Sequence, residues 1–177
     1  DDDYGQSVLQ DKYGDYLILG WTESFGSGNK DFYLIKTNSQ GNVEWEKTYG
    51  GEDRESGYSI CENSDGSFLL AGSTSYHYGS VMVVKINNEG IEDWFKTYDD
   101  VGNSNLEAAY SVCQSNDNGY VLTGYEGLGG NMTDQFILKI SSIGEALWCK
   151  GFGGSYRDFG YCIQQTSDNG FIITGNK

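Results

Sequence analysis

The sequence predicts an all-β repeat protein, because one stretch of strand and turn signals recurs along the chain. Residues 45–75 read WEKTYGGEDRESGYSICENSDGSFLLAGSTS, and versions of this stretch begin again near Asp93 and Leu147. Corresponding glycines lie 52, 52 and 51 residues apart: Gly20, Gly72, Gly124 and Gly175. A fixed period of this length indicates stacked or radially arranged units. No apolar pattern with the 3.6-residue period of a helix is present.

Each unit begins with a predicted strand and a tight turn. In the second copy the strand is expected at residues 58–62, and the turn NSDG follows it. One position of this turn is occupied in the four copies by Gly14, Gly66, Asn118 and Asn169. Glycine and asparagine tolerate the positive φ that tight hairpin turns need. The first two strands of every unit are therefore expected to form a hairpin.

The second strand, FLLAGST in the second copy, is almost continuously apolar. Such a run predicts burial on both faces, and Gly72 within it predicts a close backbone approach or a bulge. A loop of variable length follows, because the interval from Trp45 to Trp94 differs from that between Trp94 and Trp148. A third strand, a turn that ends in glycine and a fourth strand complete the unit.

Four antiparallel strands every 52 residues or so, without helices, predict the blades of a β-propeller. We expect one partial domain over residues 1–177, with blades at about 1–50, 51–100 and 101–152 and half a blade at 153–177. Both ends offer the same half of a blade. The chain is therefore expected to need further blades of the same polypeptide, or neighbouring copies, to complete it.

These motifs as a set resemble the SBBP-type β-propeller repeat over the whole chain. They are W-x-K-T-[YF]-G-G, an acid, a small residue, S-[IV], D-G or D-N-G, an aromatic residue, G-x-T and [FV]-x-x-K. The third copy departs from the pattern with TYDDVG and with Ala109 in place of glycine. The resemblance implies a secreted or cell-surface protein and no particular reaction. Kelch repeats are the alternative family, but there the aromatic residues follow the glycine pair.

Composition excludes several classes of partner. The chain has 26 acidic and 11 basic residues, for a net charge of −15, which disfavours nucleic acid and anionic membrane surfaces. No apolar stretch approaches the length of a membrane span.

The cysteines have no zinc-binding spacing, and Cys61 and Cys113 share a repeat position. Residues at one position of neighbouring units are expected to be too far apart for a disulfide, so free thiols are predicted.

Several repeated residues have a structural and a functional interpretation. One acid per unit precedes the small residue of the first strand: Asp3, Glu55, Glu107 and Asp158. These carboxylates could accept backbone N–H groups where the strand begins, or could form a ring that binds Ca²⁺. Calcium is the one cofactor that the sequence suggests. Repeated tryptophans and lysines are expected to pack or pair within the fold: Trp45, Trp94, Trp148, Lys36, Lys85 and Lys139.

Residues that break the repeat are better candidates for binding. Two kinds of loop should open on one face of a propeller, and they carry Phe25, Tyr76, His77, Tyr78, Leu128, Tyr156 and Arg157. Exposed aromatic residues on loops are typical of carbohydrate or protein contacts. Asn131 begins an N-glycosylation sequon in the variable loop. With one histidine and no nucleophile motif, an enzyme such as a hydrolase or lyase is disfavoured. We expect a non-catalytic scaffold, adhesion element or fibre subunit, or alternatively a glycan- or protein-binding module.

Overall fold

The chain folds into antiparallel β-sheets, and within each sheet the strands pair in the order of the sequence. The computed structural model describes residues 2–75, 79–99, 106–127 and 133–176. The first sheet contains β1 (Asp3–Gln10), β2 (Tyr16–Thr22), β3 (Asp31–Thr37) and β4 (Val43–Tyr49). The second contains β5 (Glu55–Glu62), β6 (Phe68–Thr74), β7 (Ser80–Ile86) and β8 (Glu92–Tyr98). The third contains β9 (Leu106–Gln114), β10 (Tyr120–Gly127), β11 (Thr133–Ile140) and β12 (Ala146–Phe152), and the fourth pairs β13 (Phe159–Gln165) with β14 (Phe171–Asn176). The predicted all-β class and the four-stranded unit are confirmed.

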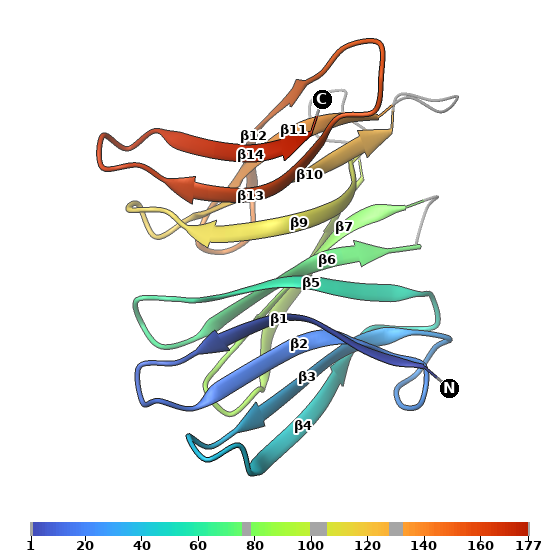
Figure 1. Ribbon diagram of the computed structural model, residues 1–177, viewed down its shortest axis with the longest axis vertical. Helices are drawn as coiled ribbons and strands as arrows, with labels where there is room; N and C mark the ends of the chain where they lie inside the picture. The colour runs from blue at the N-terminus through green and yellow to red at the C-terminus, as the bar shows by residue number, and fades with distance from the viewer. Residues whose placement is uncertain (1, 76–78, 100–105, 128–132, 177) are drawn as a thin grey trace.

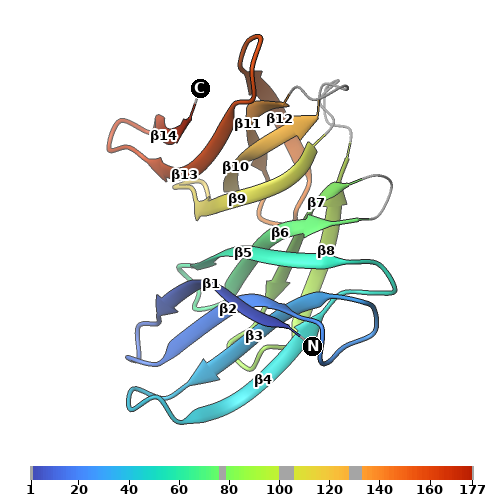
Figure 2. The ribbon, with the colours of Figure 1, turned by 45° about the vertical axis from the view of Figure 1, so that its right-hand side comes forward.

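The sheets are stacked so that their first strands lie in a row (Figures 1 and 2). β1 contacts β5, β5 contacts β9, and β9 contacts β13. Each sheet therefore packs its face against the next sheet along the stack. The described part of the chain contains no apolar helix of membrane-spanning length.

The hydrophobic core lies between the sheets, in two layers that share β6. Leu70 packs with Leu19 and Phe32 of the first sheet. Leu69, one residue earlier on the same strand, packs with Leu122 of the third sheet. Because successive side chains of a strand point to opposite faces, β6 is buried on both sides as its apolar run predicts. β14 differs: its Ile172 is 56% exposed, since among the described residues no further sheet covers that face.

The first strand of each sheet carries a bulge that the glycine of the second strand accommodates. The register of β5 against β6 shifts between Gly57 and Ser59, which leaves Tyr58 without a partner. A Cβ at Gly72 would overlap the carbonyl oxygen of Ser56, so the predicted close approach and bulge are both confirmed. Pairing continues beyond the bulge to Glu55, which makes β5 three residues longer than expected. The last hairpin likewise spans residues 159–176 rather than 161–175.

The predicted hairpin turns have the expected backbone conformation. The shared turn position has φ of 91° at Gly14, 84° at Gly66, 62° at Asn118 and 67° at Asn169. Each turn begins with a side chain that accepts or donates hydrogen bonds within the turn, such as Asp11, whose carboxylate accepts from the backbone N–H groups of Tyr13 and Asp15. The identity of the turn residue thus follows from a φ that other residues rarely adopt.

The repeated lysines pair with carboxylates of these turns, as predicted. Lys36 is 5% exposed, and its Nζ lies 3.5 Å from carboxylate oxygens of both Asp11 and Asp15. Lys139 Nζ lies 2.9 Å from Asp117 Oδ1, and Lys85 pairs with Asp65. The paired lysine holds the pKa of the Asp117 carboxyl well below its usual range.

The repeated tyrosines and tryptophans of the fourth strands tie each sheet to the next. Tyr49 Oη donates a hydrogen bond of 2.8 Å to the carbonyl oxygen of Gly90, in the turn between β7 and β8. The Trp45 ring lies against the same glycine. Tyr98 and Trp94 contact Gly144 in the same way. Trp45 and Trp94 therefore pack against the core as expected, whereas Trp148 is 37% exposed.

Candidate functional site

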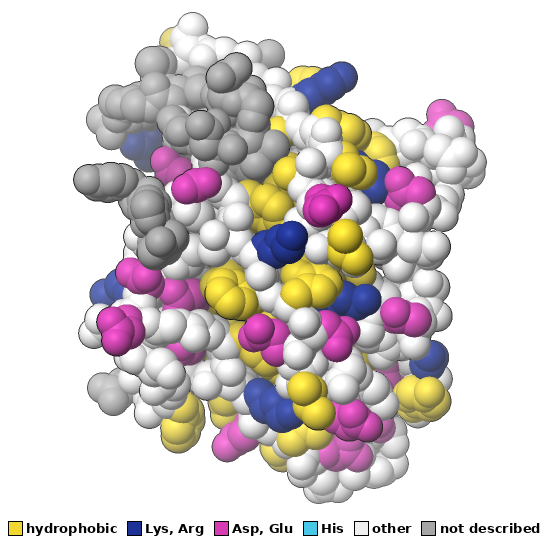
Figure 3. All heavy atoms as spheres, turned by 180° about the vertical axis from the view of Figure 1, so that it is seen from behind, with side chains coloured by type: hydrophobic (Ala, Val, Ile, Leu, Met, Phe, Trp, Pro, Cys, Tyr) yellow, Lys and Arg dark blue, Asp and Glu magenta, His cyan; other side chains and the backbone are white. Residues whose placement is uncertain are grey.

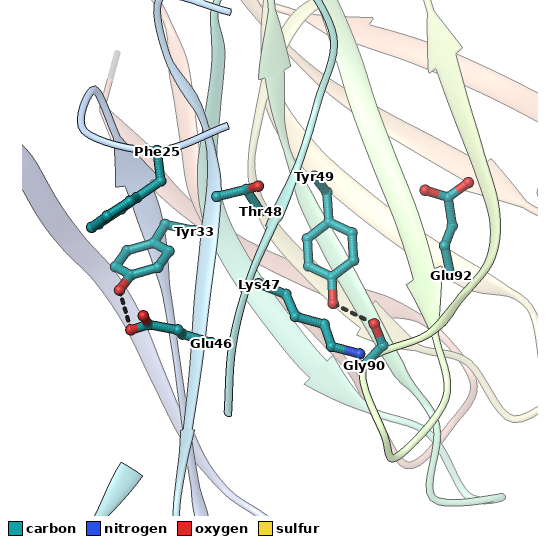
Figure 4. Close-up of a pocket in the computed structure, with 8 residues that line it drawn as sticks. All are labelled: Phe25, Tyr33, Glu46, Lys47, Thr48, Tyr49, Gly90 and Glu92. Atoms are coloured by element: carbon teal, nitrogen blue, oxygen red, sulfur yellow. Dashed lines mark hydrogen bonds between the residues drawn. The ribbon is translucent and has the colours of Figure 1, made fainter. Parts of the chain in front are cut away.

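A groove beside the loop between β2 and β3 lies where the first and second sheets meet (Figure 4). It has a volume of about 520 Å³ and lies between β4 and the segment that leads into β8. We call it the Phe25 groove. Its lining residues are Phe25, Tyr33, Glu46, Lys47, Thr48, Tyr49, Gly90 and Glu92.

One wall of the Phe25 groove is aromatic and carries a fixed acceptor. Phe25 is 57% exposed, and its ring centroid lies 5.9 Å from that of Tyr33. Tyr33 Oη donates a 2.6 Å hydrogen bond to Glu46 Oε2 (Figure 4). Burial, followed by the bond to Glu46, raises the pKa of Tyr33 to about 12. At neutral pH Tyr33 therefore keeps its proton, and Glu46 stays oriented by it.

This wall breaks the repeat, whereas the floor of the groove follows it. The floor bond from Tyr49 to Gly90 recurs in the next sheet. In contrast, Met82 and Phe95 take the positions of Tyr33 and Glu46 in the second sheet. The architecture does not require the polar wall. An exposed ring beside oriented carboxylate and hydroxyl groups suits a neutral, hydrogen-bonding ligand such as a sugar.

A second surface is a row of tyrosines along the first strands. The bulge of each strand presents Tyr58 on β5, Tyr110 on β9 and Tyr161 on β13. Ring centroids lie 5.1 Å apart from Tyr58 to Tyr110 and 5.8 Å apart from Tyr110 to Tyr161. Burial and the neighbouring tyrosines raise the pKa of Tyr110 above its usual range. Since each tyrosine recurs just after the small residue of its strand, the spacing in the sequence could have identified this row.

The loop residues predicted to bind do not form one patch. Phe25 lies on the loop between β2 and β3, while Tyr156 and Arg157 lie on the loop between β12 and β13. These loops are at opposite ends of the stack (Figures 1 and 2). Tyr156 is 80% exposed. The remaining candidates lie outside the described residues: Tyr76, His77, Tyr78, Leu128 and Asn131.

The two predicted kinds of loop do meet at one end of the sheets. Arg54, in the connection from β4 to β5, pairs with Glu23 of the loop after β2 at 3.3 Å. The backbone of Arg54 also forms an isolated parallel β-bridge with the backbone of Lys30 in the same loop. Lys30 Nζ in turn lies 3.3 Å from the centroid of the Trp21 ring.

Hydrogen bonds hold two of the four repeated acids, Asp3 and Glu55. Asp3 accepts a hydrogen bond from Thr22 Oγ1, which lowers the pKa of Asp3. Glu55 accepts from Thr74 Oγ1 at 2.8 Å and from the Gly51 N–H at 3.1 Å, although burial raises its pKa. The predicted structural role is thus present at Glu55.

The other two acids have different surroundings. Burial, followed by the charge of Glu107, raises the pKa of Tyr125 beside it. Neither oxygen of Asp158 has a hydrogen-bond partner among the described residues. In the described part of the chain, no three His, Cys, Asp or Glu side chains gather where they could hold one metal ion. The calcium ring therefore stays a prediction without a shared ligand cluster.

On the face of the molecule that Figure 3 shows, charge is distributed rather than concentrated. Figure 3 shows the face opposite to the view of Figure 1, where Asp and Glu side chains alternate with Lys, Arg and hydrophobic ones. The four cysteines are free thiols, and Cys162 is the exposed one. Burial raises the pKa of Cys61 to about 12.

Comparison with known proteins identifies a fold relative. No protein-family model and no curated protein matches the chain. A solved structure of a protein of unknown function from Bacteroides caccae superposes with a TM-score of 0.62 at 11% sequence identity. The match covers 97% of this chain and 53% of that one, so this chain spans about half the length of its relative. At this identity the similarity concerns the fold alone.

Proposed function

We propose that the sheets are blades of a β-propeller. Three observations support this: the row of first strands, the order of strands within each sheet, and the burial of β6 on both faces. All three are features of radially repeated four-stranded sheets. An experimental structure of the longest natural form of the chain tests the proposal. A closed ring of blades is expected, and an open or barrel-shaped stack would contradict it.

We further propose that the protein is a non-catalytic scaffold or adhesion element on the cell surface. The observation that supports this role is that the repeated polar side chains are used to hold the fold together. Lys36 and Lys139 neutralise turn carboxylates, and Tyr49 and Tyr98 fix neighbouring sheets. Such residues are engaged and are not poised for proton transfer. The resemblance to SBBP-type repeats supports the surface location.

Two measurements test this function. Immunolabelling of intact cells should detect the protein without permeabilisation. A screen for polysaccharide hydrolase and lyase activity, with and without added Ca²⁺, should give no turnover. Labelling that requires permeabilisation would refute the cell-surface location. The scaffold role would be refuted by hydrolase or lyase activity that disappears when mild heating unfolds the protein.

A second candidate function is recognition of a saccharide in the Phe25 groove. The polar wall of Tyr33 and Glu46 favours it, because the repeat does not require these residues. A sugar ring could stack on Phe25 while Glu46 accepts from its hydroxyl groups. A glycan array should then show binding that Phe25→Ala weakens by at least about fivefold, from roughly 1 kcal/mol of ring contact.

The matched control for this test is Tyr156→Ala, which removes an even more exposed aromatic side chain from the far loop. This variant should bind as the wild type does. Equal losses of glycan binding in both variants would show non-specific adsorption. If the wild type binds no glycan, saccharide recognition is refuted and the scaffold role is the candidate function that remains.

A further inference from the structure

Two aspartates lie together, largely without hydrogen bonds, between the third sheet and the β13–β14 hairpin. Asp158 is 2% exposed, and both of its carboxylate oxygens are buried without a hydrogen-bond partner among the described residues. The Oδ1 atom of Asp134, on β11, is also buried without a hydrogen-bond partner among the described residues. The hydroxyl oxygen of Thr133 is also buried and has no hydrogen-bond partner in the described part of the chain. None of the ion pairs formed by described residues includes either carboxylate.

Gly153 shows how close the two carboxylates are. A Cβ on this glycine would be in direct contact with Asp134 Oδ1 and 2.7 Å from Asp158 Oδ2. Both oxygens therefore lie against the same glycine, and the Asp134 carboxylate takes up the room that a side chain there would need. Asp158 and Gly153 also line a pocket of about 260 Å³, whose other walls include the amide side chains of Gln135 and Asn176.

The interface between the first and second sheets provides an internal comparison. There Asp31 and Glu55 occupy the repeat positions of Asp134 and Asp158, and Gly50 takes the place of Gly153. Asp31 Oδ2 accepts hydrogen bonds from the backbone N–H groups of the preceding loop, at 3.1 and 3.3 Å. Glu55 has its two bonds to Thr74 and Gly51. Among the described residues, the protein's own donors satisfy the pair at the first interface, whereas both oxygens of Asp158 and Oδ1 of Asp134 have no hydrogen-bond partner.

An unsatisfied pair of buried carboxylates is unfavourable for two reasons. Each ion loses its hydration without gaining a partner, and the two negative charges repel each other. A positive charge bound between the two carboxylates would remove both costs. Neither histidine nor cysteine lines the pocket, so the available ligands are oxygens. Hard divalent cations prefer such ligands, and Ca²⁺ accepts carboxylate, amide and hydroxyl oxygens together with water at 2.3–2.6 Å.

We propose that Asp158, which lines this pocket, and Asp134, whose Oδ1 lies against the lining residue Gly153, bind a calcium ion that joins the third sheet to the β13–β14 hairpin. Thr133, Gln135 and Asn176 offer neutral oxygens, and water completes the coordination. This site differs from a ring of the four repeated acids, because it uses only one of them and takes its second carboxylate from β11. Binding would stabilise the contact between these two sheets.

Thermal melting of the protein with EDTA or with CaCl₂ tests the site, and Tb³⁺ luminescence or calorimetry measures binding directly. Calcium at a hundredfold excess over Kd should raise the Tm of the wild type by about 5–10 °C. Asp158→Asn removes one ligand charge and the repulsion. It should melt at or above the wild-type temperature in EDTA and should show no rise with calcium. Asp134→Asn is a second variant with the same expectation.

Glu55→Gln is the matched control, because it changes the same repeat position where hydrogen bonds already satisfy the carboxylate. Its calcium response should equal that of the wild type even if its Tm is lower. Lys177, which takes the repeat position of Thr74 and lies outside the described residues, is replaced in Lys177→Met. An amino group, rather than a metal ion, could neutralise the pair. In that case Lys177→Met lowers the Tm and calcium does not change the Tm of the wild type, and this result overturns the proposal. An unchanged calcium response in both Asp variants overturns it as well.

Discussion

Replacement of Gly72 by alanine tests whether the bulged first strand depends on the glycine opposite it. The new Cβ would overlap the Ser56 carbonyl oxygen on β5 and would lie 2.8 Å from Phe32 Cζ on the other side. Phe32 is fully buried in the layer between the first and second sheets, so it cannot swing away. The strain must therefore be relieved by moving β5 away from β6.

The cost of Gly72→Ala follows from that movement. Overpacking in a core costs about 1–3 kcal/mol, and a weakened ladder bond adds about 1 kcal/mol. Alanine restricts the unfolded chain, which returns about 0.4–1 kcal/mol. We expect a net loss of about 2 kcal/mol in the free energy of unfolding. For a chain of this size, that corresponds to a fall in Tm of roughly 4–8 °C.

Urea denaturation followed by circular dichroism measures the loss, with Gly51→Ala as the control. A Cβ at Gly51 would meet nothing within 4 Å, so this variant should match or slightly exceed the wild type in stability. If the two variants unfold within about 0.5 kcal/mol of each other, the range of ordinary surface substitutions, then the close approach does not constrain the fold.

Three further predictions follow from features of the turns, the sheet contacts and the thiols. Gly66→Val should cost about 1–3 kcal/mol because a β-branched residue is forced to positive φ, whereas Gly66→Asn, which copies the later repeats, should melt close to the wild type. Tyr49→Phe leaves the buried Gly90 carbonyl without its donor and should lower the unfolding free energy by about 1–3 kcal/mol in urea titrations; an unchanged midpoint would argue that water replaces the bond. Iodoacetamide should label Cys162 first, while Cys61 stays unlabelled near pH 8 because burial raises its pKa to about 12 and the thiolate forms only as pH rises toward that value; equal rates, or four thiols lost to disulfides, would contradict this.

The fold follows from the sequence where one residue type answers one local requirement. Gly66 and Asn118 mark positive φ, and Gly72 marks the close approach of two strands. These constraints act within a hairpin, so spacing along the chain reveals them. The extra length of β5 was missed because pairing resumes after the bulge, which the side-chain pattern alone does not show.

The candidate sites depend on residues that meet across sheets, and spacing alone does not give such distances. Asp134 is not prominent in the sequence, yet it lies beside Asp158 because the loops between sheets bring β11 to the start of β13. Tyr33 and Glu46 meet diagonally across β3 and β4, which requires the register of that pair. The spacing in the sequence is enough to predict the tyrosine row, since its members keep the repeat interval.

Within each sheet the strands pair in the order of the sequence, which has a consequence for how the chain folds. Such contacts span short loops, so closing a hairpin costs little entropy and takes microseconds, whereas a ribosome needs several seconds to add one repeat. Each sheet can thus form before the next has been synthesised. A single sheet cannot bury β6 on both faces, however, so each new sheet remains only marginally stable until its successor covers it. Folding should therefore proceed as a series of additions, with the most recently made sheet as the part most dependent on chaperones.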